Sequence, residues 1–165
     1  MSMDILVHPN PVLRVCAGDA ERFGQRELKD LVAQMARAMY DAPGVGLAAT
    51  QVGVMERVLV YDVDDQLVAL CNPQISRVSE ETELSEEGCL SLPGIEVPVE
   101  RAVSLTCDAY DINGDPITIE AEGLLARVIQ HEIDHLDGVL IIDRATPEER
   151  RAAIRRYNEA VRTRA

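Results

Sequence analysis

The sequence predicts an α+β fold, in which an antiparallel or mixed sheet packs around a central helix and another helix lies at the C-terminal end. Two observations lead to this prediction. Apolar residues recur at helical spacing in residues 25–41, 122–136 and 146–163. Between the first two of these segments, apolar and polar residues alternate over residues 103–109, as in a half-buried strand. Helices grouped before and after a run of strands are typical of the α+β class.

The first helix is predicted over residues 25–41, because its apolar side chains share one face, and it ends at Pro43-Gly44. Residues 57–63 are rich in β-branched and apolar side chains and predict a strand. Farther along, Asn113-Gly114 is a strong signal for a tight turn. With Ile117-Thr118-Ile119 after it, we expect a hairpin whose first strand is residues 103–109.

The central helix, residues 122–136, carries two adjacent stripes of side chains. One stripe holds Leu124, Val128, His131 and His135, and Gly138 stands just past the end, near the expected C-terminal cap. The second stripe consists of Leu125, Ile129, Glu132 and Leu136. This helix therefore combines a core-facing surface with chemically reactive side chains.

The last helix is predicted over about residues 146–163. Thr146 suits the N-cap, Pro147 the first helical position, and Glu149 completes a capping box. Ile154, Tyr157 and Val161 lie at helical spacing, and we expect all three to pack against the body of the protein.

Length and composition indicate one domain spanning residues 1–165. The chain is 47% hydrophobic and 27% charged, as in globular proteins, with no repeat or low-complexity segment. Its net charge of -13 argues against a chain-wide surface for DNA. Neither a signal peptide nor a membrane-spanning run is apparent, and the four cysteines form no C-x-x-C pair. We therefore expect a cytoplasmic protein with reduced cysteines.

The most informative motif is His131-Glu132-Ile133-Asp134-His135, which lies within the central helix. Residues four apart are neighbours on a helix, so both imidazoles can reach one metal ion. Glu132 lies on the adjacent stripe, where it can contact water without being a ligand. This H-E-x-x-H arrangement is typical of hydrolases in which a metal polarises water and the glutamate moves its proton. The alternative is a pair of half-buried histidines on an ordinary helix.

A catalytic metal usually has three protein ligands, so a third is needed. No histidine follows His135, which leaves upstream residues or a carboxylate. His8 lies in a turn-rich segment, and the sequence around Cys107 indicates a buried hydrophobic position. Cys89 follows Gly88, and a glycine permits close approach of the backbone to another group. Spacing therefore moderately favours Cys89 as the third ligand over the other three cysteines and His8.

A third segment, residues 44–53, is rich in glycine but lacks the Lys-Ser/Thr of a phosphate-binding loop. On its own it is best interpreted as a connection between a helix and a strand. A functional interpretation requires Gln51 in the site, where its side-chain amide could donate to a developing oxyanion.

Taken together, three motifs make the chain resemble the bacterial peptide deformylases. They are Gly-Val-Gly-Leu-Ala-Ala-Thr-Gln at residues 44–51, Glu-Gly-Cys-Leu-Ser at residues 87–91 and Gln-His-Glu-Ile-Asp-His-Leu-Asp-Gly at residues 130–138. The resemblance covers nearly the whole chain. It implies removal of the formyl group from the N-terminal formylmethionine of new proteins.

The resemblance also implies a role for each matching residue. Cys89, His131 and His135 would hold the metal, and Glu132 would be the general acid/base. Gln51 and the backbone N–H of Leu90 would stabilise the oxyanion. The residues implied in binding the substrate are Gly46, by its backbone, and Val45, Leu124 and Val128, in the methionine pocket.

One position departs from the family, because Glu96 stands where one of its branches has arginine.

Two nitrogens and a thiolate suit zinc, iron, cobalt or nickel, and the resemblance favours Fe²⁺. The competing interpretations are a general zinc peptidase and a structural metal domain, although a structural zinc site normally has four protein ligands.

Charge is unevenly distributed along the chain. Residues 144–165 carry a net charge of +4, whereas residues 1–143 carry -17. The structural interpretation of the terminal helix is a docked surface helix whose arginines pair with the acidic body of the protein. The functional interpretation is that these arginines bind ribosomal RNA near the emerging nascent chain.

Overall fold

The computed structural model describes residues 3–164, so the predicted domain limits at residues 1 and 165 lie outside the described residues. The helices are α1 (Arg26–Asp41), α2 (Leu124–Leu136), α3 (Ile141–Arg144) and α4 (Pro147–Arg164), with short 3-10 helices η1 (Pro11–Arg14) and η2 (Ala49–Val52). The strands are β1 (Gly46–Ala48), β2 (Val58–Val63), β3 (Gln66–Val78), β4 (Thr82–Cys89), β5 (Leu92–Ala102), β6 (Ser104–Tyr110) and β7 (Pro116–Glu122).

The strands form two sheets in which neighbouring strands are antiparallel. The larger sheet has the order β1-β2-β3-β6-β7, and β4 and β5 form a separate pair. The expected antiparallel or mixed sheet is therefore antiparallel. The hairpin predicted at Asn113-Gly114 joins β6 to β7, with Gly114 in the left-handed region at φ 89°.

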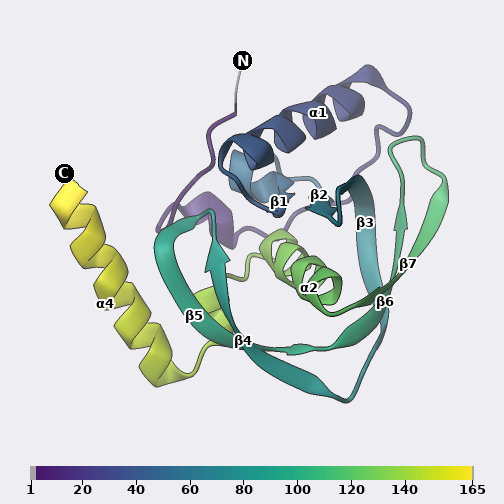
Figure 1. Cartoon of the computed structure of the whole chain (residues 1–165). Helices are drawn as coiled ribbons and strands as arrows, with labels where there is room; N and C mark the ends of the chain where they lie inside the picture. The colour runs from purple at the N-terminus through teal and green to yellow at the C-terminus, as the bar shows by residue number, and fades with distance from the viewer. Residues whose placement is uncertain (1–2, 165) are drawn as a thin grey trace.

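Helix α2 lies between the two sheets, with α1 outside β1 and β2 and α4 beside β5 (Figure 1). It contacts β1, β2 and β7 on one side and β5 on the other. The apolar side chains of α2 are buried among those of the larger sheet, where Ile129 and Leu136 pack with Leu59 and Leu105. This packing fixes the rotation of α2 and so the direction in which its histidines point.

The predicted helices and strands are confirmed in type and approximate extent. The segments expected at residues 25–41, 57–63 and 122–136 correspond to α1, β2 and α2. Gly138 adopts φ 77° just after α2, and a Cβ there would lie 2.5 Å from the carbonyl oxygen of Arg14, so only glycine fits this cap.

Helix α4 begins as predicted but packs over less of its length. The backbone N–H of Glu149 donates to Oγ1 of Thr146 at 3.2 Å, which caps the helix. Ala153 and Tyr157 are buried, and Ile154 packs against the same cluster. The expectation for Val161 was wrong, because its side chain is 44% exposed. The main contacts of α4 are with β5 and α3, and its C-terminal end extends beyond these two elements (Figure 1).

None of the helices in residues 3–164 is both long enough and apolar enough to cross a membrane.

Candidate active site

The two histidines of α2 point toward the same place. Their Nε2 atoms lie 3.2 Å apart, as expected for residues one helical turn from each other. Cys89, at the end of β4, brings its Sγ to 3.2 Å from Nε2 of His135. A shift of register between Gly88 and Cys89 turns the end of β4. Thus residues 46 positions apart in the sequence converge on one point.

These three side chains are the only potential metal-binding group of this kind found within residues 3–164. Their ligand atoms all lie within 4.8 Å of one another. Ligands bonded at about 2.0–2.3 Å to one tetrahedral ion are themselves roughly 3.3–3.7 Å apart, so separations of this order suit a shared ion. A thiolate and two imidazole nitrogens are also an appropriate donor set for a transition metal. The residues present therefore fit a bound divalent metal.

The other candidate ligands lie elsewhere. Burial raises the pKa of Cys71 and of Cys107 to about 11, so both remain neutral thiols near pH 7. Cys16 is exposed. His8 packs its ring against Tyr157, with the ring centroids 5.6 Å apart. The choice of Cys89 among the four cysteines thus agrees with its position beside the histidines.

Glu132 projects from α2 into a pocket. Its Oε1 is buried and has no hydrogen-bond partner among the described residues. Burial raises the pKa of Glu132 to about 7, although the electrostatic interaction with His131 opposes this effect. A carboxyl group with a pKa near neutral can both accept and release a proton at physiological pH.

Gly46 makes room for this carboxyl group. A Cβ at residue 46 would lie 2.6 Å from Oε2 of Glu132 and 3.1 Å from its Cδ. Any larger residue would therefore push the carboxyl group out of its place.

The side-chain amide of Gln51 also lies close to the sulfur of Cys89. Its Oε1 accepts a hydrogen bond from the backbone N–H of Ala48 at 2.9 Å, and this contact orients the amide. Its Nε2 then donates to Oγ of Ser91 at 3.0 Å and lies 4.0 Å from Sγ of Cys89. The amide is thus aimed at the place where the three ligand atoms meet. Leu90, between Cys89 and Ser91, lines the same pocket.

The pocket has a volume of about 680 Å³. Val45, Gly46, Leu124 and Val128, all expected to bind substrate, line it. Val45 and Leu124 are about half exposed at its mouth, whereas Val128 is buried. Glu96, at the position that departs from the family, is outside this lining, and its carbonyl oxygen accepts a hydrogen bond from Arg156.

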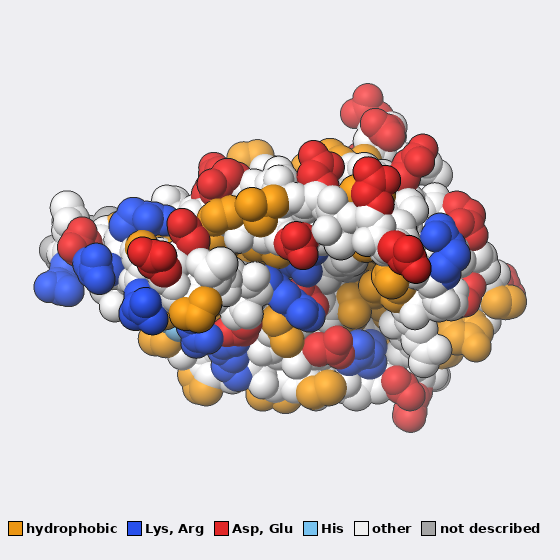
Figure 2. Space-filling view, turned by 90° about the horizontal axis from the view of Figure 1, so that it is seen from below, with side chains coloured by type: hydrophobic (Ala, Val, Ile, Leu, Met, Phe, Trp, Pro, Cys, Tyr) orange, Lys and Arg blue, Asp and Glu red, His pale blue; other side chains and the backbone are white. Residues whose placement is uncertain are grey.

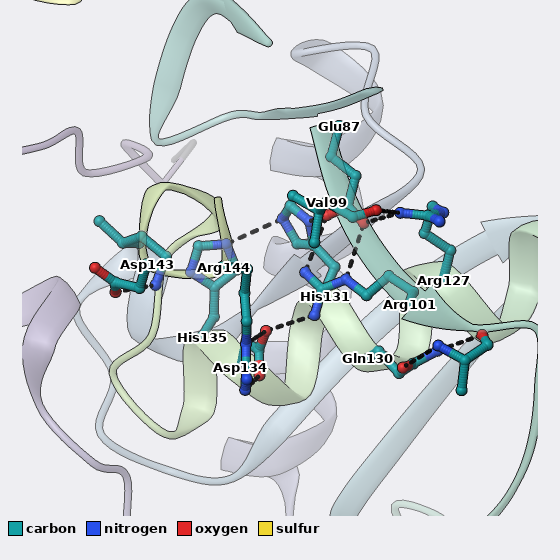
Figure 3. Close-up of polar contacts among 12 residues, drawn as sticks. Glu87, Val99, Arg101, Arg127, Gln130, His131, Asp134, His135, Asp143 and Arg144 are labelled. Atoms are coloured by element: carbon teal, nitrogen blue, oxygen red, sulfur yellow. Dashed lines mark hydrogen bonds and ion pairs between the residues drawn. The ribbon is translucent and has the colours of Figure 1, made fainter. Parts of the chain in front are cut away.

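Behind His131 lies a group of buried charges that the sequence did not reveal. Nδ1 of His131 is 2.9 Å from Oε1 of Glu87 (Figure 3). Burial alone would raise the pKa of Glu87, but hydrogen bonds from His131 and Arg101 lower it to about 2. An ionised carboxylate only accepts hydrogen bonds, so Nδ1 of His131 carries the proton and Nε2 is left free as a ligand.

Two sequence signals could have identified these partners. Glu87 lies two residues before Cys89 on a strand and therefore shares its face. Ile95, Val97, Val99 and Arg101 occupy alternate, inward positions of β5, and all are buried. A charged residue at the end of such an inward series indicates a buried ion pair.

Comparisons with known proteins agree with this site. Residues 2–151 match the family model described as polypeptide deformylase. A peptide deformylase of Acidothermus cellulolyticus is 48% identical over 151 residues, which is 92% of this chain and 83% of that protein. One from Rhizobium meliloti is 44% identical, with 97% and 94% of the two chains covered.

Solved structures give the same result. A peptide deformylase from Legionella pneumophila superposes with a TM-score of 0.93 at 40% identity, covering 99% of this chain and 98% of that one. The enzyme from Synechococcus elongatus in complex with actinonin has a TM-score of 0.90 at 40% identity, with 94% and 86% covered. The family match, these relatives and the converging cysteine and histidines lead to one conclusion: the chain belongs to the polypeptide deformylase family.

Proposed function

We propose a role for each site residue in the reaction of this chain, which belongs to a family of metal-dependent enzymes. The reaction removes the formyl group from the N-terminal formylmethionine of newly made proteins. In the proposed assignment Cys89, His131 and His135 hold the metal. The observation that carries it is the convergence of their ligand atoms within 4.8 Å beside a pocket that Glu132 and Gln51 also line. We assign the whole of residues 1–165 to one catalytic domain, with α2 as its central metal-binding helix.

When bound, the ion supplies Lewis-acid chemistry, which activates water and polarises the formyl group. Glu132 accepts a proton from the attacking water and delivers it to the amine nitrogen that leaves. Nε2 of Gln51 and the backbone N–H of Leu90 donate to the formyl oxygen as it gains negative charge. Because hydrogen-bond donors held in place before the reaction need no rearrangement, the contact between Gln51 and Ala48 supports this role.

The pocket suits an extended peptide that begins with methionine. Strand β1 is at the edge of its sheet, so the open side of its backbone near Gly46 can pair with a peptide. Val45, Leu124 and Val128 supply an apolar surface for the unbranched methionine side chain.

The decisive assay uses formyl-Met-Ala-Ser with the metal-loaded protein. We expect release of formate and appearance of a free N-terminal amine, with no cleavage between residues of the peptide. Cleavage of internal peptide bonds would favour a general peptidase. Bound metal with neither activity would favour a structural metal site.

For the metal itself we propose Fe²⁺, with Zn²⁺, Ni²⁺ and Co²⁺ as the alternatives that the same donor set accommodates. The family resemblance supports iron. Metal analysis of protein purified under nitrogen tests this proposal, and activity should decay in air and persist without oxygen. A native enzyme that is stable in air would point to zinc or nickel.

We also propose that α4 guides the enzyme to ribosomes, where nascent chains emerge. Arg151, Arg155 and Arg162 are exposed and form no ion pair with any described residue. Among the arginines of α4 whose side chains the structure describes, only Arg150 forms an ion pair with the body, with its Nη1 3.5 Å from Oδ1 of Asp143. Figure 2 shows basic side chains gathered at the end of the molecule where α4 lies, and acidic ones over much of the remaining face. A basic end on an acidic protein would be attracted to the phosphates of RNA.

Co-sedimentation with ribosomes tests this partner. Changing Arg151, Arg155 and Arg162 together to Glu should abolish binding and leave turnover of a short formyl peptide intact. The matched control changes Arg26, Arg37 and Arg77 to Glu, because these residues are also exposed and give the same change in net charge. Binding should also weaken steeply with added salt. Binding unaffected by charge reversal and salt would leave α4 as a structural element only.

A further inference from the structure

The charges behind His131 form a continuous chain of contacts that runs across the molecule. Arg101 of β5 is its centre, and its side chain is only 4% exposed. On one side, its Nε and Nη2 donate to the two carboxylate oxygens of Glu87 at 2.9 and 3.0 Å. On the other, its Nη1 donates to Oδ2 of Asp134 at 2.6 Å (Figure 3). One guanidinium therefore joins a carboxylate of β4 to a carboxylate of α2.

The series of contacts continues to α3, the segment that precedes α4. Arg144, the last residue of α3, donates to both oxygens of Asp134 at 3.1 and 2.8 Å. Arg144 thus fixes Asp134, Asp134 and Glu87 fix Arg101, and Glu87 accepts the proton on Nδ1 of His131. Each link is a charge-assisted hydrogen bond, the class with the most restrictive geometry.

Asp134 cannot act directly on substrate. It is absent from the lining of the 680 Å³ pocket and instead borders a separate cavity of about 190 Å³ with Arg101, Arg144 and Gln130. The hydrogen-bonded route from Asp134 to the site runs through Arg101 and Glu87 to His131. Without Asp134, the buried guanidinium of Arg101 would lose one of its two carboxylate partners. The uncompensated charge would favour a shift of Arg101, and Glu87 would move with it.

Resting on the proposed role of His131 as a metal ligand, we propose that Asp134 is a positioning residue for the metal site. Through Arg101 and Glu87, Asp134 keeps the imidazole of His131 turned toward Cys89 and His135. Because Arg144 belongs to α3, this arrangement depends on the docking of α3. The contact of Arg144 with Asp134 therefore supports the metal site on the side away from the substrate pocket.

The test compares Asp134→Asn with Asp143→Asn in the metal-loaded enzyme. Asp143 is a matched control, because it is also a partly buried carboxylate that binds two arginines, Arg14 and Arg150, next to α4. Its contacts do not lead to His131. We expect Asp134→Asn to lose metal to a chelator about 10–100-fold faster than the unchanged protein, and Asp143→Asn to lose it at the unchanged rate.

Two further measurements separate positioning from stability alone. In Asp134→Asn, kcat for formyl-Met-Ala-Ser should fall while KM stays constant, because Asp134 does not touch Val45, Leu124 or Val128, the proposed binding surface for methionine. In the cobalt-substituted protein, the visible absorption bands of the metal should shift in Asp134→Asn and stay unchanged in Asp143→Asn. If Asp134→Asn does not fold, Arg144→Gln serves in its place, since Arg144 is half exposed and should give the same changes at smaller size.

Equal rates of metal loss and unchanged cobalt spectra in both variants would overturn the proposal. His131→Ala tests separately the assumption on which the proposal rests, namely that His131 is a metal ligand. If His131→Ala retains metal as well as the unchanged protein does, the assignment of His131 as a ligand is wrong. If only His131→Ala loses metal, that assignment stands and the role of Asp134 is refuted.

Discussion

Helices α2 and α4 are both amphipathic, yet they use their charged residues in opposite ways. In α2, Glu132 and Asp134 are buried and the side chain of His131 is 11% exposed; His131 pairs with Glu87, and Asp134 pairs with Arg101. In α4, arginines face solvent, and the residues buried against the body extend as far as Tyr157.

Burial explains the difference. A charge taken out of water costs free energy unless it is paired, so the charges of α2 require a built environment. Exposed arginines have no such requirement and contribute little to stability. Changes in α2 should therefore act on chemistry, whereas changes in α4 should act on packing or on association with partners.

The largest effect is expected at the centre of α2. Glu132→Ala should keep the metal but lower kcat by about 10²–10⁴-fold, because the proposed role of its carboxyl group is to move protons and not to bind the metal. Steady-state kinetics together with metal analysis measure both quantities. Glu120→Ala, at an exposed position of β7, is the control and should be neutral. A Glu132→Ala enzyme that keeps most of its kcat would remove the proposed role.

Within α4, the contrast between packed and exposed positions predicts a smaller effect, and on stability only. Tyr157 is 3% exposed and Val161 is 44% exposed. We expect Tyr157→Ala to lower the free energy of unfolding by about 3 kcal/mol, and Val161→Ala to change it by less than about 0.5 kcal/mol. Urea denaturation measures both values. Similar losses in the two variants would mean that the whole helix is docked.

Gly46 allows the position of the α2 carboxyl group to be tested without removing it. Gly46→Ala would place a Cβ 2.6 Å from Oε2 of Glu132, and displacing a reacting group by about 1 Å can cost about 10²-fold in rate. We expect a fall of about this size in kcat, with metal content unchanged. Gly18→Ala is the control, because a Cβ there meets nothing within 4 Å. Full activity in Gly46→Ala would show that Glu132 tolerates displacement.

Much of the helical structure could be predicted from periodicity and caps, because α1 and α2 bury continuous stripes of apolar residues. The extents of β3 and β4 could not. β3 is interrupted by Asn72-Pro73, where Asn72 adopts φ 50°, and β4 is largely exposed and rich in glutamate. Strands of this kind lack the alternation from which a strand is predicted.

The candidate site divides in the same way. His131, Glu132 and His135 could be found because their spacing on a helix has a direct geometric meaning. The selection of Cys89 needed the resemblance to a family. Strand alternation could have indicated that Glu87 and Arg101 are buried, but local sequence patterns do not show that contacts join Glu87, Arg101 and Asp134 across β4, β5 and α2.

The central claim is that Cys89 completes a metal site with the two histidines. The most direct measurement is the metal bound per chain after dialysis under nitrogen, for Cys89→Ser beside Cys107→Ser, with folding checked by circular dichroism. The account predicts that Cys89→Ser loses metal while Cys107→Ser, changed in a buried thiol of the larger sheet, retains it. Equal loss in both variants, or loss in neither, would contradict it.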